Sequence, residues 1–110
     1  MDPVQGQLDA YNERNLERFL SYYAPDTRIE DGSGNLIVQG HAGIRAFYDP
    51  VFTNSPNLRA EVVNRIRVGR YVVDEERGSG LVAEGLPSEI HGAIVYRVDG
   101  DVITHVRFLT

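Results

Sequence analysis

The sequence predicts a single α+β domain, in which helices come first and an antiparallel sheet follows. The chain has 110 residues, a length that suits one hydrophobic core. In its first half apolar residues recur every three or four positions, which is typical of amphipathic helices. In its second half, runs rich in Val, Ile, Tyr and Arg are separated by short turn signals, which is typical of strands. Helices followed by a strand meander indicate an α+β domain.

Two short helices are expected at the N-terminus. The apolar positions that follow helical spacing, with one slip between residues 12 and 15, are Val4, Leu8, Tyr11, Leu16, Phe19, Leu20 and Tyr23. Because Asn15 is a good N-cap residue, we expect one helix to end near residue 13 and a second to run from Leu16 to Tyr23. Pro25 is expected to stop the second helix.

A hairpin and a third helix are expected next. Residues 27–31 and 36–39 are short apolar-containing runs, and the turn-forming sequence Asp-Gly-Ser-Gly-Asn separates them. The apolar residues that then fall on one helical face are Ile44, Phe47, Tyr48, Val51 and Phe52. Pro50 lacks a backbone donor, so it is predicted to kink this helix or to restart it near Asp49.

Four strands are expected at residues 58–68, 71–84, 88–98 and 102–109, and Asp99-Gly100 is a strong hairpin signal before the last one. In the last strand two alternating sets of residues face opposite ways. One set is Val102, Thr104, Val106 and Phe108, and the other is Ile103, His105, Arg107 and Leu109. Both sets contain apolar residues, so the pattern leaves the inner face open and predicts a homodimer through the outer face of the sheet.

The charge balance and the missing residue types exclude several classes of function. The net charge is −5, and the 11 basic residues are all Arg and are spread singly, so no nucleic-acid partner is expected. Without Lys or Cys the chain has no Schiff-base lysine, thiolate nucleophile or disulfide. The N-terminus lacks a basic start and an apolar run, and no stretch is apolar enough to span a membrane. We therefore expect a cytoplasmic protein without a membrane partner.

Short segments with a characteristic order and spacing connect the chain to a known family. They include Tyr-Ala-Pro-Asp at 23–26, Ile-Glu-Asp at 29–31, Gly-Ile-Arg-Ala-Phe-Tyr at 43–48 and Ala-Ile-Val-Tyr-Arg-Val-Asp-Gly at 93–100. Together they resemble the nuclear transport factor 2-like superfamily, in particular its SnoaL-like and ketosteroid isomerase-like members, as one domain over residues 1–110. The resemblance implies a cone: a curved antiparallel sheet wrapped around N-terminal helices, with an open-ended apolar pocket, commonly in dimers. Members include isomerases, polyketide cyclases and non-catalytic binding modules, so function must be argued from the site.

Asp31 stands where the isomerase-like members carry the carboxylate base that moves a proton next to a carbonyl. An aspartate at a pocket rim beside apolar Ile29 would lose water, which raises its pKa toward the range useful to a general base. The alternative is that Asp31 only opens its turn by accepting backbone hydrogen bonds, as Asp before Gly often does. The sequence leaves both readings open.

The oxyanion donors of the isomerase-like members are not retained. The position of the family's oxyanion tyrosine falls at Gln7, and that of its protonated aspartate falls near Ile94, which has no donor. Tyr11 and Tyr96 are candidate substitutes, because each carries a phenolic donor, although such residues are often core tyrosines with one hydrogen bond. The resemblance therefore stops short of a true ketosteroid isomerase.

His105 and Arg107 lie two residues apart on the last strand and so share a face. If that face lines the pocket, the imidazole can act as acid or base and the guanidinium can clamp a carboxylate, enolate or phosphate. If it points outward, His105 packs at a dimer interface and Arg107 pairs with an acid. Residues 75–77, Glu-Glu-Arg, are expected to be a solvated strand end.

These observations predict a protein that binds a small molecule. One form of this hypothesis is an isomerase- or cyclase-like acid/base enzyme acting on an apolar, carbonyl-containing metabolite, and the other is a non-catalytic ligand-binding or dimerisation module. The candidate residues are Asp31 and His105 for catalysis, with Gln7, Tyr11, Tyr96 and Arg107 for binding. No cofactor is expected, and no metal, because Glu89 and His91 lack a third ligand at a suitable spacing.

Overall fold

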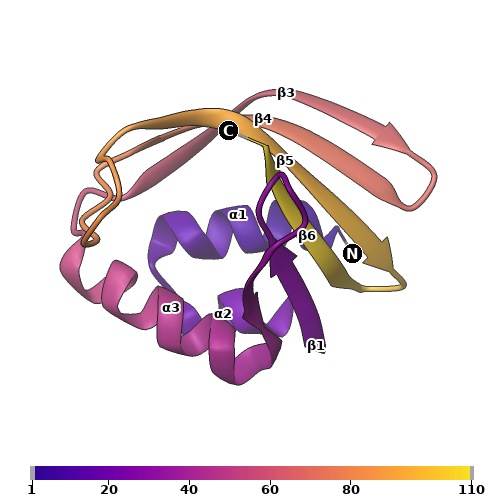
Figure 1. The fold of residues 1–110 in the computed structure, drawn as a ribbon, viewed down its shortest axis with the longest axis horizontal. Helices are drawn as coiled ribbons and strands as arrows, with labels where there is room; N and C mark the ends of the chain where they lie inside the picture. The colour runs from indigo at the N-terminus through magenta and orange to yellow at the C-terminus, as the bar shows by residue number, and fades with distance from the viewer. Residues whose placement is uncertain (1, 110) are drawn as a thin grey trace.

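The computed structural model describes residues 2–109 and has the predicted α+β architecture, with N-terminal helices packed against a curved sheet. The sheet arches over α1, and α2 and α3 lie below α1 in this view (Figure 1). The elements in chain order are α1 (Pro3–Glu13), α2 (Leu16–Ser21), β1 (Tyr23–Glu30), β2 (Leu36–Gln39), α3 (Gly40–Asn54), β3 (Arg59–Val68), β4 (Tyr71–Ser79), β5 (Ile90–Asp99) and β6 (Val102–Leu109).

The six strands form one sheet in the order β2-β1-β6-β5-β4-β3. Four of the neighbouring pairs are antiparallel, including the predicted meander from β3 to β6, and β1 and β6 run parallel, so the sheet is mixed. The antiparallel pairs are close in sequence and are joined by hairpins or a short loop. The parallel pair joins the two ends of the chain, where no turn dictates direction.

The predicted break between the first two helices is present. The Asn15 side chain accepts a hydrogen bond from the Arg18 N–H, which caps the start of α2. The second helix is shorter than predicted, because α2 ends at Ser21 and the chain is already extended at Tyr23. Pro25 therefore lies inside β1 instead of stopping a helix.

The third helix is continuous across Pro50, so it does not restart near Asp49. Its first residue, Gly40, has φ +73°, and a Cβ there would lie 3.0 Å from the Pro25 carbonyl oxygen, so glycine suits the tight passage from β2 into α3. β4 ends at Ser79, five residues earlier than residue 84 predicted from the sequence. Gly80 (φ +71°) then turns the chain toward the Asn57 backbone.

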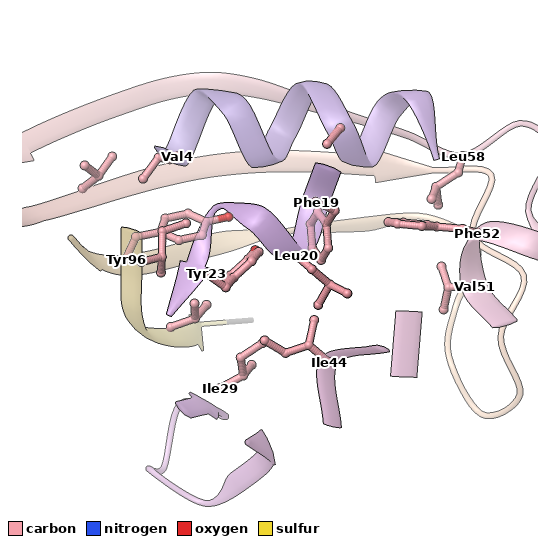
Figure 2. Packing of buried hydrophobic residues seen from close by; sticks show 14 residues of the cluster. Val4, Phe19, Leu20, Tyr23, Ile29, Ile44, Val51, Phe52, Leu58 and Tyr96 are labelled. Atoms are coloured by element: carbon pink, nitrogen blue, oxygen red, sulfur yellow. The ribbon is translucent and has the colours of Figure 1, made fainter. Parts of the chain in front are cut away.

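The core lies between the inner face of the sheet and the three helices. Phe19 stands between Tyr23 and Phe52 in Figure 2, and its ring centroid is 5.0 Å from that of Tyr23, 4.8 Å from that of Tyr48 and 5.5 Å from that of Phe52. One aromatic side chain thus links α2 to β1 and α3. Between residues 2 and 109, no helix is long and apolar enough to cross a bilayer.

A β-bulge decides which residues of β6 face the core. Arg97 pairs with His105, but the next residue of β5, Val98, pairs with Ile103, so Thr104 is an extra residue in β6. The bulge breaks the strict alternation read from the sequence. Ile103 (0% exposed) and Val106 (2% exposed) both point inward as a result, while His105 and Arg107 share the outer face.

Candidate functional site

Four hydrogen-bonded side chains gather between α1 and the inner face of the sheet, and we call Gln7, Tyr23, Glu76 and Tyr96 the interior polar cluster. The Tyr23 hydroxyl donates to Gln7 Oε1 (3.0 Å), Gln7 Nε2 donates to the Tyr96 hydroxyl oxygen (3.2 Å), and that hydroxyl donates to Glu76 Oε2 (3.2 Å). Tyr23 and Tyr96 lie near Val4 at the same end of the core in Figure 2. The cluster joins α1, β1, β4 and β5 through side chains alone.

Glu76 reaches the interior because alternate residues of β4 face inward. Val72 and Asp74, four and two residues earlier, are buried, so Glu76 is on their face while its neighbours are on the other. The sequence-based expectation that residues 75–77 form a solvated strand end is therefore wrong at Glu76. Val72 and Val73 are both apolar and residues 74–77 are all charged, so the sequence has no alternating pattern that would have indicated this burial.

Glu76 supplies the carboxyl group of the interior polar cluster, and its pKa suits proton transfer. Burial raises its pKa to about 7, and the nearby negative charge of Asp74 acts in the same direction. The hydrogen bond from Tyr96 and the charge of Arg65 act in the opposite direction. A carboxyl group that titrates near neutral pH can both take up and release a proton.

Asp74 holds the guanidinium group that would otherwise be free to neutralise Glu76. Asp74 is 0% exposed. Arg65 on β3 donates two hydrogen bonds to its carboxylate, from Nε (2.6 Å) and from Nη2 (2.9 Å). Arg65 Nη1 also donates to Gln5 on α1 (2.8 Å). Glu76 therefore lies near a guanidinium group that is already paired.

Two further tyrosines, Tyr11 and Tyr48, lie within the electrostatic influence of Glu76. The negative charge of Glu76 acts on both Tyr11 and Tyr48, and burial raises the pKa of Tyr11 to about 12 and that of Tyr48 still further. In the described part of the chain, neither hydroxyl makes a hydrogen bond that would occupy it. The rings of Tyr11 and Tyr48 meet edge to face at 6.3 Å. Tyr11 and Tyr48 thus carry neutral phenolic donors that do not bind Glu76 itself.

A second charged group, which we call the outer ion cluster, lies on the opposite face of the sheet. It centres on Glu30, whose carboxylate contacts His105 Nε2 (2.9 Å), Arg107 Nη2 (3.1 Å) and Arg28 Nε (3.1 Å). Hydrogen bonds from His105, Arg107 and Arg28, in that order of importance, lower the pKa of Glu30 to about 2. This carboxylate is held ionised, which makes it a structural anion rather than a base.

An open hollow of about 720 Å³ lies on the same outer face. His105 and Arg107 belong to its lining, which also includes Tyr71, Val95, Arg97, Asp99, Thr104 and Leu109. A second hollow of about 340 Å³, lined in part by Arg77 and His91, lies near the other end of β3, β4 and β5. The structure therefore separates His105 and Arg107 from the interior polar cluster by the thickness of the sheet.

Asp31 lies in the turn between β1 and β2. Its Oδ1 accepts the backbone N–H groups of Ser33 (2.9 Å) and Asn35 (2.9 Å), and its Oδ2 accepts the Asn35 side-chain amide (3.2 Å). The backbone hydrogen bond from Asn35 is the largest cause of a lowered pKa at Asp31. This geometry matches the turn-forming alternative, whereas the catalytic role of Asp31 stays a prediction.

The predicted site residues thus fall into two groups. Gln7, Tyr11 and Tyr96 meet in the interior around Glu76, and the fold brings them together as one polar site. Asp31, His105 and Arg107 belong to the outer side and the β1–β2 turn. The predicted ligand pocket itself stays a prediction, because the hollows described above are on the outer face.

The sequence profile of the SnoaL-like domain matches residues 4–106, which is nearly the whole chain. The chain belongs to the SnoaL-like domain family. A comparison with curated proteins gives no significant match. The SnoaL-like fold explains why a curved sheet encloses the interior polar cluster on one face and leaves the other face uncovered.

Three solved structures resemble this SnoaL-like chain. An uncharacterized cystatin fold protein from Novosphingobium aromaticivorans is 24% identical, with a TM-score of 0.87 over 100% of this chain and 99% of that one. A putative polyketide cyclase from Sinorhizobium meliloti is 18% identical, with a TM-score of 0.77 over 96% and 92%. A computationally designed 17-OHP binder is 17% identical, with a TM-score of 0.80 over 98% and 89%. At these identities the likeness shows the fold alone.

Proposed function

We propose that this SnoaL-like protein binds an apolar, carbonyl-containing small molecule at the interior polar cluster and transfers a proton there, as an isomerase- or cyclase-like enzyme. The observation that carries the proposal is the Glu76 carboxyl group, which is partly buried, has no ion-pair partner within residues 2–109 and has a pKa of about 7. Glu76 takes the role of base that the sequence assigned to Asp31.

The chemistry follows from the groups around Glu76. Ionised Glu76 removes a proton from the carbon next to the carbonyl. The electron pair of that C–H bond forms a C=C bond, and the π pair of the carbonyl moves to its oxygen to give an enolate. The hydroxyl groups of Tyr11 and Tyr48 can donate to this oxygen, where the negative charge develops. In a β,γ-unsaturated ketone the enolate is conjugated with the second double bond, so return of the proton from Glu76 to the γ-carbon shifts that double bond, completes an isomerisation and restores the carboxylate.

The apolar substrate class is supported by the surroundings of the cluster. Rings of Phe19 and Phe52 pack against Tyr11, at centroid distances of 6.2 and 5.6 Å. A ligand that entered among these packed rings would be ring-containing rather than charged. A putative polyketide cyclase and a designed 17-OHP binder share this fold, which agrees with the proposal without deciding it.

The test is exchange of the α-protons of 2-tetralone, a small apolar ketone, for deuterium in D₂O, followed by NMR. The native protein is expected to accelerate the exchange, and Glu76→Gln is expected to lose about 100-fold or more of that acceleration, because the amide cannot take up the proton. Asp31→Asn serves as the comparison, since both substitutions turn a carboxylate into an amide. Far-UV circular dichroism checks that both variants are folded.

The outcomes separate the candidate functions. Loss of exchange in Asp31→Asn with full exchange in Glu76→Gln would return the base to Asp31 and overturn the proposal. The second candidate, a non-catalytic binding module, is favoured by the dense ring contacts of Phe19 with Tyr23 and Tyr48. It predicts that 2-tetralone raises the thermal unfolding temperature while neither the native protein nor any variant accelerates exchange.

We also propose that the protein forms a homodimer through the outer face of the sheet. Ile66, Val73 and Val95 are cross-strand neighbours there and form an apolar band. The band continues into Val68 and Tyr71, which are 65% and 44% exposed. Exposed contiguous apolar surface is typical of an interaction site. No nucleic acid or membrane is part of the proposal, and the cytoplasmic location stays a prediction.

Ile66→Asp is expected to convert the dimer to a monomer, because it places a charge in the middle of the apolar band. Light scattering after size-exclusion chromatography measures the mass. Val82→Asp is the matched control, since Val82 is as exposed as Ile66 (54% against 52%) but lies in the loop after β4. A native protein that is monomeric at high micromolar concentration would contradict the proposal.

A further inference from the structure

We propose that Gln7 is a positioning residue, which directs the Tyr96 hydroxyl hydrogen onto Glu76 and so controls when Glu76 is ionised. The inference rests on the proposed function for its catalytic meaning, but the hydrogen-bond geometry supports it independently of turnover. It assigns a role to the residue that stands where the isomerase-like relatives have their oxyanion tyrosine. Gln7 acts through Tyr96 and does not touch the reacting atoms itself.

All the hydrogen-bonding groups of the Gln7 amide are used. Nε2 donates to the Val4 carbonyl oxygen (3.0 Å) and to the Tyr96 hydroxyl oxygen (3.2 Å), and Oε1 accepts from the Tyr23 hydroxyl (3.0 Å). Gln7 is only 5% exposed, so water cannot readily replace these partners. A flipped amide would present its oxygen to the Val4 carbonyl, so this orientation is fixed by the backbone of α1.

The fixed amide determines where the Tyr96 hydrogen points. A phenol has one hydrogen to donate, and its oxygen accepts from Gln7. The hydrogen is then directed to Glu76 Oε2, at 3.2 Å. The bonds run in one direction, from Tyr23 through Gln7 and Tyr96 to Glu76, and bonds aligned in this way strengthen one another.

Glu76 depends on this donor because its other neighbours do not supply one. Asp74 on the same strand is an anion, and Arg65 on β3 is held by Asp74. The charge of Glu76 acts on Tyr11 of α1 and Tyr48 of α3, but neither makes a hydrogen bond to it within residues 2–109. Tyr96 thus occupies Oε2 and leaves Oε1 for the proton of a ligand.

The test is the titration of the Glu76 carboxyl carbon, followed by NMR in the protein without ligand. Tyr96→Phe removes the donor, and it is expected to raise the titration midpoint by about one pH unit, since hydrogen bonds to charged groups favour the ionised form. Gln7→Met keeps the length of the side chain but not its amide. It is expected to shift the midpoint in the same direction by at least about half as much.

The two substitutions are combined to show that Gln7 acts through Tyr96. In the Tyr96→Phe background, Gln7→Met is expected to leave the midpoint unchanged, because the connection to Glu76 is already absent. An equal shift in both backgrounds, or no shift in either, would overturn the inference. A purely structural role of Gln7 would lower stability without moving the midpoint.

Tyr23→Phe provides a second variant that preserves the ring in the core. It removes only the hydrogen bond to Gln7 Oε1, so a smaller upward shift of the Glu76 midpoint is expected, and again none in the Tyr96→Phe background. If Gln7→Met does not fold, this variant decides the inference alone. A further outcome is that the Glu76 midpoint stays the same in all these variants while the protein still accelerates the deuterium exchange of 2-tetralone. That result would retain the proposed function and reject the role of Gln7.

Discussion

Replacing Phe19 with alanine is expected to lower the free energy of unfolding by about 3–5 kcal/mol, the range for truncating a large buried aromatic side chain. Phe19 is 1% exposed and belongs to the buried core. Its ring meets those of Tyr11, Tyr23, Tyr48 and Phe52 at centroid distances of 4.8 to 6.2 Å. The cavity left by Ala would lie where α1, α2, α3 and β1 converge, so a local adjustment of one element cannot close it.

Urea denaturation followed by circular dichroism measures this loss, with Phe47→Ala as the control. Phe47 is 36% exposed and its ring contacts that of Tyr48 at 5.0 Å. Its truncation is expected to cost about 1 kcal/mol or less, as is usual for partly exposed sites. Equal losses at the two positions would mean that the ring cluster around Phe19 is loose, which would also make room for a ligand beside Glu76.

The local parts of the fold could be predicted because they depend on residues close in sequence. Asn15 caps α2 and the turn after residue 31 joins β1 to β2, as their spacing indicated. The parallel pairing of β1 with β6 could not be predicted in this way. It joins segments such as Ile29 and Val106, which pair across most of the chain, and no turn or periodic pattern encodes the direction of that contact.

The site was only partly predictable, for two physical reasons. The extra residue Thr104 in β6 shifts the alternation, which moves His105 to the outer face without leaving a mark in the hydrophobic pattern. The burial of Glu76 depends on the helices that pack opposite β4. Neither the residues next to Glu76 in the sequence nor its own residue type indicates that burial. Gln7 was named through the resemblance, and Tyr11 and Tyr96 were named for their phenolic donors. The fold places Gln7 and Tyr96 in one hydrogen-bonded cluster, while the binding role of all three stays a prediction.

Replacing Arg65 with alanine is expected to cost about 3–5 kcal/mol of stability at neutral pH, because it leaves a buried carboxylate without its partner. Asp74 has 0% exposure and receives two hydrogen bonds from this one guanidinium group. Arg67→Ala, two residues along the same strand, is the matched control. Its partner is Asp2 at an exposed position, and exposed pairs contribute about 0–1 kcal/mol.

The double variant Arg65→Met with Asp74→Leu separates the attraction between these charges from the cost of burying one alone. Apolar replacement of a whole buried ion pair is often close to neutral, so the double variant is expected to recover most of the stability lost in Arg65→Ala. It also removes both charges that act on Glu76. Because Asp74 raises the pKa of Glu76 more than Arg65 lowers it, that pKa is expected to fall in the double variant. Urea denaturation and the Glu76 titration therefore give two independent readings of one ion pair. A fall in stability without a change at Glu76 would limit Arg65 and Asp74 to a structural role, whereas changes in both would make the pair part of the machinery that sets the proton affinity of the site.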